Sequence, residues 1–334
     1  MIDSTGFATQ AWQMDSIMNR IEREFKVELK NIQGHYDTSV QWKVAISPHD
    51  DYTYASYLYP AVIRNIKAKH IFMIGVFHKA KVFDINNQLI FGNYKAWAGP
   101  YGNTMISPLR DEILKALPDS IRVVKDTIMA VEHSLEALLP FIQYYNRDAQ
   151  IIPMLVPYAN LDNMERFSDM LANQIHRIAE KKNWVWGEDF AILISNDAVH
   201  YGDEGWGGND FARYGTDIEG YRMAVEHEME IIDSCLTGEL SNGKVRKFIN
   251  YTVDKDDYMQ YKWTWCGRYS IPCGLFLADH LQEIYAADGK LHGNLIGYAN
   301  SIDHPKLHVE DLGMGATAPA NDHHWVGYTA IGYK

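Results

Sequence analysis

The sequence predicts a single-domain α/β protein in which helices cover a central sheet that is mainly parallel or mixed. Three observations support this class. Short, continuous apolar runs alternate with longer amphipathic segments along most of the chain, as in successive β-α-β units. The chain has 334 residues, of which 47% are hydrophobic, so it can bury a large core. Neither a repeat nor a linker divides it, and we therefore expect one domain over residues 1–334.

The apolar runs are bounded by polar or turn residues and rich in branched side chains, as buried strands are. The expected strands cover residues 42–47, 70–77, 121–124, 150–156, 190–195, 295–299 and 325–333. Apolar residues three and four positions apart indicate helices. These cover residues 12–25, 55–67, 108–116, 132–145, 163–181 and 217–236, with a last helix from about residue 266 to 285. Residues 1–41 form an N-terminal helical extension, and residues 300–324 form a long loop before the final strand.

The charge balance excludes two classes of partner. There are 31 Lys and Arg against 43 Asp and Glu, which gives a net charge of −12, and no basic cluster. A nucleic-acid backbone or an anionic membrane requires concentrated positive charge, so we expect neither as a partner. The N-terminus lacks the basic flank and apolar run of a secretion signal, and no run of about 18 apolar residues occurs. Three cysteines, an odd number, fit a reducing compartment. We expect a soluble, cytoplasmic protein.

Histidines follow three of the expected strands at the point where each strand ends. These are His49, within SPHDDYTY, His78, and His200 with the nearby Asp197. Because the carboxyl ends of parallel strands lie on one edge of a sheet, these side chains are expected to converge there. The convergence favours a metal or acid/base site. The alternative is structural, with Asp50 or Asp51 capping the next helix and His49 only occupying the turn.

Two further segments carry candidate groups. Glu132 and His133 lie in VEHSLEALLPF, where a helix would point a carboxylate and an imidazole at one cavity. The alternative is a solvated first helical turn whose acids complement the helix dipole. Cys266 lies just before an expected helix, and the helix N-terminus and Arg268 favour its thiolate form. The alternative for this cysteine is a small buried hydrophobic residue.

The candidate groups offer two kinds of metal site. Two imidazoles with a thiolate suit zinc, copper or iron, whereas two imidazoles with a carboxylate are typical of an oxygen-activating ferrous site. His200 is then free to accept protons, with the near-neutral pKa of an ordinary histidine. The glycine-rich stretch 202–210 lacks a phosphate-binding motif, and we expect a flexible loop able to close over a site. For His323 and His324 we expect solvent or an interface.

The chain resembles the Memo family, also called AmmeMemoRadiSam system protein B, which is related to the class III extradiol ring-cleaving dioxygenases. The landmarks run in family order: SPHDDYTY, GVFHK, VEHSLEALLPF, IIPMLVPY, ISNDAVHYG, WCGRYSI, GYANS and VGYTAIGY. The resemblance implies a three-layer α/β sandwich and a metal, iron or copper, at His49, His78 and Cys266. It also implies that His133, Asp197 and His200 line the same cavity, with His200 similar to the acid/base histidine of the dioxygenases.

Three positions depart from the family pattern. Asp50 and Asp51 stand where Ala-Gly is usual, Lys79 stands where a second histidine often follows, and Asn196 stands where a serine is common. The two carboxylates beside His49 are able to bind a metal or to cap a helix. Lys79 would bring positive charge to an anionic substrate. The pocket is therefore expected to differ from that of the family in metal or substrate.

The expected function is that of a Memo-like, metal-dependent redox enzyme acting on an unidentified small molecule. The expected roles are metal binding by His49, His78 and Cys266 (iron or copper, with zinc as a further option), catalysis by His200, Asp197 and His133, and substrate contacts from Glu132, Asp50, Lys79 and Arg268. The alternative is a non-enzymatic adaptor that binds a metal or a peptide in the same cavity. A third reading, catechol ring cleavage, requires a carboxylate ligand such as Glu132 or Asp50, and Cys266 argues against it. The aromatic richness is compatible with a homodimer.

Overall fold

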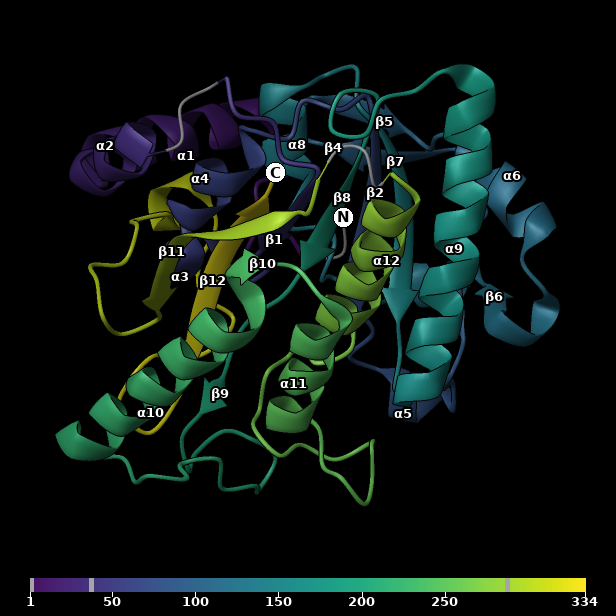
Figure 1. Ribbon diagram of the computed structural model, residues 1–334. Coiled ribbons are helices and arrows are strands. Elements are labelled where there is room, and N and C mark those ends of the chain that lie inside the picture. The colour runs from purple at the N-terminus through teal and green to yellow at the C-terminus, as the bar shows by residue number, and fades with distance from the viewer. Residues whose placement is uncertain (1–2, 36–38, 286–288) are drawn as a thin grey trace.

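The computed structural model describes residues 3–35, 39–285 and 289–334. Its centre is a ten-stranded mixed sheet in the order β10-β11-β12-β1-β8-β2-β7-β3-β6, with β9 paired to β12 (Figure 1). The four middle strands run parallel: β1 (Val44–Ser47), β8 (Phe190–Ser195), β2 (His70–Val76) and β7 (Gln150–Val156). The carboxyl ends of β1, β8 and β2 therefore lie next to one another.

Antiparallel strands extend the sheet on both sides. Beside β1 lie β12 (Trp325–Tyr333), β11 (His292–Asn300) and β10 (Gly238–Glu239), each antiparallel to its neighbour. Beside β7 lie β3 (Leu89–Phe91) and β6 (Arg122–Val124). The short β9 (His200–Tyr201) pairs with the beginning of β12. A separate hairpin consists of β4 (Ala96–Gly99) and β5 (Gly102–Met105). The predicted α/β sandwich with a mixed sheet is confirmed.

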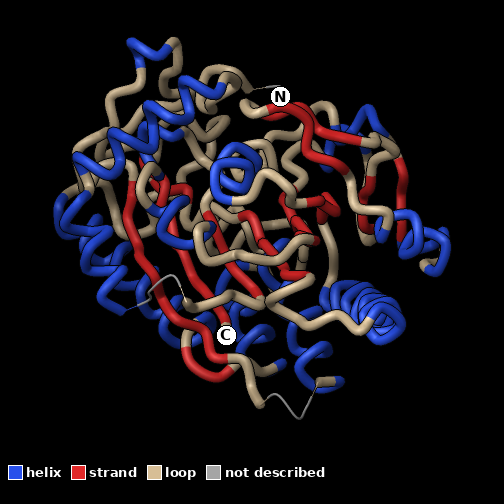
Figure 2. Tube along the Cα trace, turned by 90° about the horizontal axis from the view of Figure 1, so that it is seen from above, coloured by secondary structure: helices blue, strands red, loops and turns tan. Residues whose placement is uncertain are grey.

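Helices cover both faces of the sheet (Figure 2). One face is covered by α6 (Leu109–Ala116), α9 (Leu161–Lys182), α10 (Ile218–Ile231), α11 (Asn242–Thr252) and α12 (Ser270–Ile284). The other is covered by α1 (Ala11–Glu24), α2 (Lys26–His35), α3 (Tyr52–Ala55), α4 (Leu58–Ile63), α7 (Asp126–Met129) and α8 (Leu139–Tyr145), with α5 (Ala80–Phe83) at its edge. Val44 and Ile46 face the first group and Ala45 faces the second, which is why the strand sequences are apolar throughout. Among the described residues no helix is both long and apolar enough to span a bilayer.

Four expected helices differ from the structure. The helix expected at 55–67 is replaced by α3 and α4, which are separated by Ser56 and Tyr57. The helix expected at 132–145 begins only with α8, whose first turn contains Pro140, a residue that lacks the N–H needed deeper inside a helix. The helix expected from Cys266 starts later, at Ser270. The predicted helix 217–236 ends in a π-helical turn, Ile232–Leu236, and α11 was not expected.

Candidate metal centre

Three predicted residues meet at the carboxyl edge of the parallel strands. His49 follows β1, Asp197 follows β8 and His78 follows β2, and these strands are direct neighbours. His49 and Asp197 are buried, with 2% and 4% of their surface exposed. The strand exits thus converge, as the sequence predicted.

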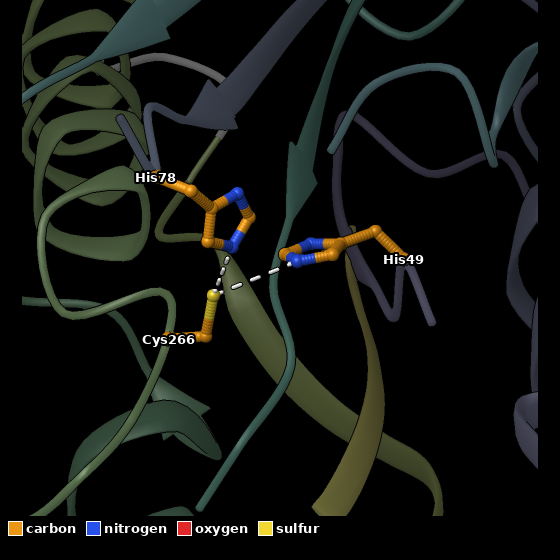
Figure 3. A group of neighbouring side chains, drawn as sticks. All are labelled: His49, His78 and Cys266. Carbon is orange, nitrogen blue, oxygen red and sulfur yellow. Dashed lines mark hydrogen bonds between the residues drawn. The ribbon is translucent and has the colours of Figure 1, made fainter. Parts of the chain in front are cut away.

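Cys266 joins the two histidines from the turn before α12. Its Sγ atom lies 3.0 Å from Nε2 of His78 and 3.5 Å from Nε2 of His49. The three side chains point toward one another (Figure 3), and their ligand atoms all lie within 4.8 Å of one another. Two nitrogens and one sulfur at this separation leave room for one ion with short bonds to all three.

The hydrogen bonds of His49 fix which of its nitrogens carries the proton. Ser195 donates its hydroxyl to the carbonyl oxygen of Ser134, so its Oγ is left as an acceptor. Nδ1 of His49 lies 2.8 Å from this Oγ and must therefore donate to it. Burial lowers the pKa of His49 well below its usual value, which keeps the ring neutral. The lone pair is therefore on Nε2, the atom that lies 3.5 Å from the sulfur of Cys266 and 3.2 Å from Oδ2 of Asp197.

The ring of His78 is also oriented by a hydrogen bond at Nδ1, in this case to a carboxylate. Its Nδ1–H donates to Oε1 of Glu132 at 2.9 Å and its backbone N–H donates to Oε2 at 2.8 Å. Burial opposes a charge on His78, but the negative charge of Glu132 and that of Cys266 when ionised, with their hydrogen bonds to the ring, outweigh it and raise the pKa of His78 well above the usual value. The Nε2 atom therefore attracts a cation, which is a proton in the absence of a metal. A carboxylate behind a ligating imidazole is a common supporting arrangement in metal sites.

A second ligand set, His78, Glu132 and His133, also lies within 4.8 Å. Oε1 of the carboxylate in this set is already saturated, because besides His78 it accepts the backbone N–H groups of His133 and Ser134 at 2.9 Å each. Burial opposes its ionisation, yet His78 and these donors lower the pKa of Glu132 to about 2. The geometry thus favours the thiolate set over the carboxylate set. Glu132 supports His78, and it lies in an irregular segment rather than on the helix we expected.

The protonation of Cys266 differs from the sequence prediction. Burial raises the pKa of this thiol, an effect that outweighs the lowering by His78. The helix dipole contributes less than expected, because α12 begins four residues after the cysteine. Without a metal the sulfur is therefore a thiol, and a bound ion would be needed to convert it to the thiolate.

A cavity of about 460 Å³ opens beside these residues. Its lining consists of Asp3, Phe7, His49, Asp50, Asp51, His78, His133, Asp197, His200, Gly205, Trp206, Thr317, Ala318, His324 and Val326. The ring of His133 stacks on His78 with centroids 4.7 Å apart and is partly exposed. Asp197 accepts the backbone N–H of His49 at 2.9 Å. The structure therefore brings all three predicted catalytic residues to the cavity.

His200 is less basic than we expected. Burial and the neighbouring His78 lower its pKa to about 3, so the imidazole is neutral at pH 7 and does not titrate near neutrality. Its Nε2 atom has no hydrogen-bond partner among the described residues, and its ring lies 5.1 Å from that of Trp206. Nε2 of His200 is thus free to form a hydrogen bond with a bound molecule.

The two aspartates after His49 have separate roles. Asp51 occupies the N-cap position of α3, but its carboxylate accepts from Thr317 of the long loop instead of capping the helix. Asp50 accepts the hydroxyl of Tyr328 at 2.6 Å and the backbone N–H of Asp51 at 2.7 Å, and it reaches the cavity. The capping alternative is therefore wrong for both side chains.

Two predicted substrate contacts lie away from the described lining of the cavity. The Arg268 guanidinium is buried against Tyr261, 3.3 Å from the ring centroid, and donates to the carbonyl of Met259. Lys79 is exposed and absent from that lining. A substrate contact from either residue stays a prediction. Asn196, the third departure from the family pattern, accepts the backbone N–H of Gly267 at 3.0 Å and so fixes the residue next to Cys266.

Sequence reasoning missed three supporting residues. Glu228 of α10, fully buried, accepts the indole N–H groups of Trp263 and Trp265 and the backbone N–H of Val199, which ties together the segments before Cys266 and His200. Ser195 orients His49. His324 was expected at solvent or an interface, but it is buried and lines the cavity. No local pattern in the sequence of α10 indicates that the carboxylate of Glu228 is buried.

Two loops form one wall of the cavity. The ring of Trp206, from the glycine-rich stretch, stacks on His324 with centroids 3.8 Å apart. His324 donates from Nδ1 to the carbonyl of Glu204 at 2.9 Å, and the exposed His323 pairs with Asp203 at 2.8 Å. The predicted loop at 202–210 thus contacts the long loop before β12, and its tryptophan reaches the site.

The fold and the site together define an α/β protein with a candidate two-histidine, one-cysteine metal centre at the edge of a parallel sheet. The family model described as "Memo-like protein" matches residues 13–314, and the chain belongs to this family. Curated relatives include a MEMO1 family protein of Aquifex aeolicus, 28% identical over 165 residues, which cover 48% of this chain and 54% of the relative. Another, from Pyrococcus abyssi, is 26% identical over 174 residues, covering 51% and 56%. The chain spans about half the length of the curated relatives it matches.

Proposed function

We propose that this Memo-like protein binds iron or copper through His49, His78 and Cys266 and uses the ion in redox chemistry on a small molecule. The observation that carries the proposal is the orientation of the two imidazoles. Hydrogen bonds to Ser195 and Glu132 occupy both Nδ1 atoms and leave both Nε2 atoms facing one sulfur. Without a metal, Nε2 of His78 carries a proton and Cys266 is a thiol, so an ion bound here would take the place of these two protons, as metals do at imidazole and thiol ligands.

The donor set limits the choice of ion. A sulfur ligand selects against magnesium and calcium, and a site with two nitrogens and one sulfur suits iron, copper or zinc. When bound, iron or copper would supply one-electron chemistry at a position open to the cavity. Three protein ligands leave further positions free, as in catalytic rather than structural sites. The adjoining cavity of about 460 Å³ supports an enzyme over a closed metal store.

The residues around the proposed ion have different roles. Ser195 and Glu132 orient the histidines, and Asp197 fixes the backbone of His49. His133 is partly exposed beside His78, and burial together with His78 lowers its pKa, so it is a neutral proton acceptor at pH 7. His200 offers a neutral Nε2 to a bound molecule. Proton transfer therefore falls to His133, while His200 serves as a hydrogen-bond partner.

Elemental analysis of protein purified without oxygen tests the metal site. We expect about one iron or copper per chain, lost in His49→Ala and retained in His176→Ala, which changes a histidine on α9. Trace metal in the wild type, or equal metal in both variants, would contradict the proposal. Oxygen consumption with a reductant then separates an enzyme from a binding module. Steady consumption that is lost in His133→Ala with the metal retained supports the enzyme, and its absence favours the adaptor.

A further inference from the structure

We infer that the cavity beside the metal site takes a ligand with a cationic, hydrogen-bond-donating group, a guanidinium or a primary ammonium, held between Asp50 and His324. The inference rests on the proposed function only in placing this ligand next to a metal. It names the chemical class of the small molecule that the site accepts.

The side chains of the cavity wall favour a ligand that donates hydrogen bonds. Four acidic residues belong to the described lining, and no lysine or arginine does: Asp3, Asp50, Asp51 and Asp197. Three of them accept hydrogen bonds from within the protein. Asp3 accepts two backbone N–H groups, Asp51 accepts from Thr317, and Asp197 accepts the backbone N–H of His49. Each oxygen of Asp50 accepts one hydrogen bond and has room for a second. Asp50 therefore has free acceptor capacity at the cavity, as has Oδ2 of Asp3 among the described contacts.

An independent observation on another element points to a donor ligand. His324, directly before β12, has only 4% of its surface exposed. Its Nδ1 lies 2.9 Å from the carbonyl oxygen of Glu204, and a carbonyl only accepts, so Nδ1 carries the proton. In the neutral ring the lone pair is then on Nε2, and this atom has no partner among the described residues. A buried acceptor without a donor is costly, so a ligand that donates here would remove that cost.

Asp50 and His324 line the same cavity. Trp206 adds an aromatic wall, since its ring stacks on His324 with centroids 3.8 Å apart. An aromatic face attracts a guanidinium or an ammonium. A planar guanidinium has enough donors to meet a carboxylate and an imidazole nitrogen at the same time. Two acceptors and an aromatic face, with neither lysine nor arginine in the described lining, match this group.

A matched pair of probes tests the inference. n-Butylguanidinium and n-butylurea have nearly the same shape, but only the first is charged. Calorimetry on the metal-loaded protein is expected to show the guanidinium binding about ten- to a hundredfold more tightly than the urea, because a charge-assisted hydrogen bond replaces a neutral one. Equal affinities, tighter binding of the urea, or no binding of either probe would overturn the inference.

Variants locate the binding. Asp50→Asn is expected to abolish the preference for the guanidinium, and His324→Phe, which keeps an aromatic ring on Trp206, is expected to weaken both probes. Asp148→Asn changes an exposed carboxylate between α8 and β7 and should leave both affinities unchanged. A preference that survives in Asp50→Asn would place the cation elsewhere and refute the assignment. If the protein holds no metal, the proposed function fails, yet the probe comparison is still valid because neither residue is in the ligand set.

Discussion

The Nε2 atom of His78 lies 3.0 Å from the sulfur of Cys266, although the two residues are 188 positions apart in the sequence. Each is held by a different part of the fold. His78 is fixed by Glu132, and the segment of Cys266 is fixed by Asn196 and by hydrogen bonds to the stretch after β8. The contact is therefore imposed by the sheet and its loops, and it does not depend on local sequence.

Cys266→Ser should weaken metal binding by about ten- to a hundredfold, because the hydroxyl is a harder and much less acidic ligand than the thiol. In the copper- or iron-loaded protein the thiolate-to-metal absorption should disappear. Cys273→Ser is the matched control, since Cys273 lies in the core of α12 with its Sγ 3.9 Å from the hydroxyl of Ser168. An unchanged spectrum in Cys266→Ser would exclude the sulfur from the site.

Glu132→Gln should weaken metal binding by about ten- to a hundredfold, the usual effect of losing a carboxylate behind a ligating histidine. The amide cannot accept all the hydrogen bonds that the carboxylate now accepts from His78, His133 and Ser134. Competition with a chromophoric chelator measures the change. Glu226→Gln, on the exposed side of α10, should behave as wild type, and a similar loss in both variants would mean that the effect is not specific to His78.

Glu228 should make the free energy of unfolding depend on pH. Burial raises the pKa of this carboxyl to about 7 from an ordinary value of 4.5, so the folded protein keeps the proton over a range where the unfolded chain releases it. The stability that this group contributes is present below pH 4.5 and falls as the pH rises to 7, by about 3 kcal/mol. Glu228→Gln lacks this titration. Urea unfolding at pH 5 and pH 7 should therefore show the variant losing less stability with pH, and parallel curves would contradict the assignment.

Trp206→Ala should expose the two histidines on which the indole lies. Burial shields His324 and the Nε2 atom of His200 in the intact protein. We expect diethyl pyrocarbonate to modify both residues faster in the variant, as measured by peptide mass spectrometry. The exposed His308, on the long loop, serves as an internal reference. Unchanged rates at His200 and His324 would show that Trp206 does not cover the site.

The sheet and the residues that follow three of its strands were predictable, because apolar runs that alternate with amphipathic helical segments indicate parallel strands. The convergence of His49, His78 and Asp197 follows from that topology alone. The role of Cys266 as a neighbour of both histidines came from the resemblance to a family, since its turn before α12 has no sequence pattern that specifies where the turn lies in space.

Other features depended on tertiary contacts. The segment after Glu132 has helical spacing, but this carboxylate accepts the next two backbone N–H groups and the chain turns until Pro140 opens α8. His324 looked like a loop residue because its burial comes from Trp206, more than a hundred positions away. The low pKa of His200 likewise follows from burial, which composition does not reveal.

A ligand set drawn from the ends of two strands and from a late turn exists only once the sheet is assembled. A ribosome-bound chain carries His49 and His78 long before Cys266 is synthesised, so it lacks the sulfur that would hold an ion firmly. Under the proposed function, firm binding of the metal would therefore follow the synthesis of Cys266 and the assembly of the sheet. The ratio of metal to polypeptide in a preparation would then report the fraction of molecules that reached the native state.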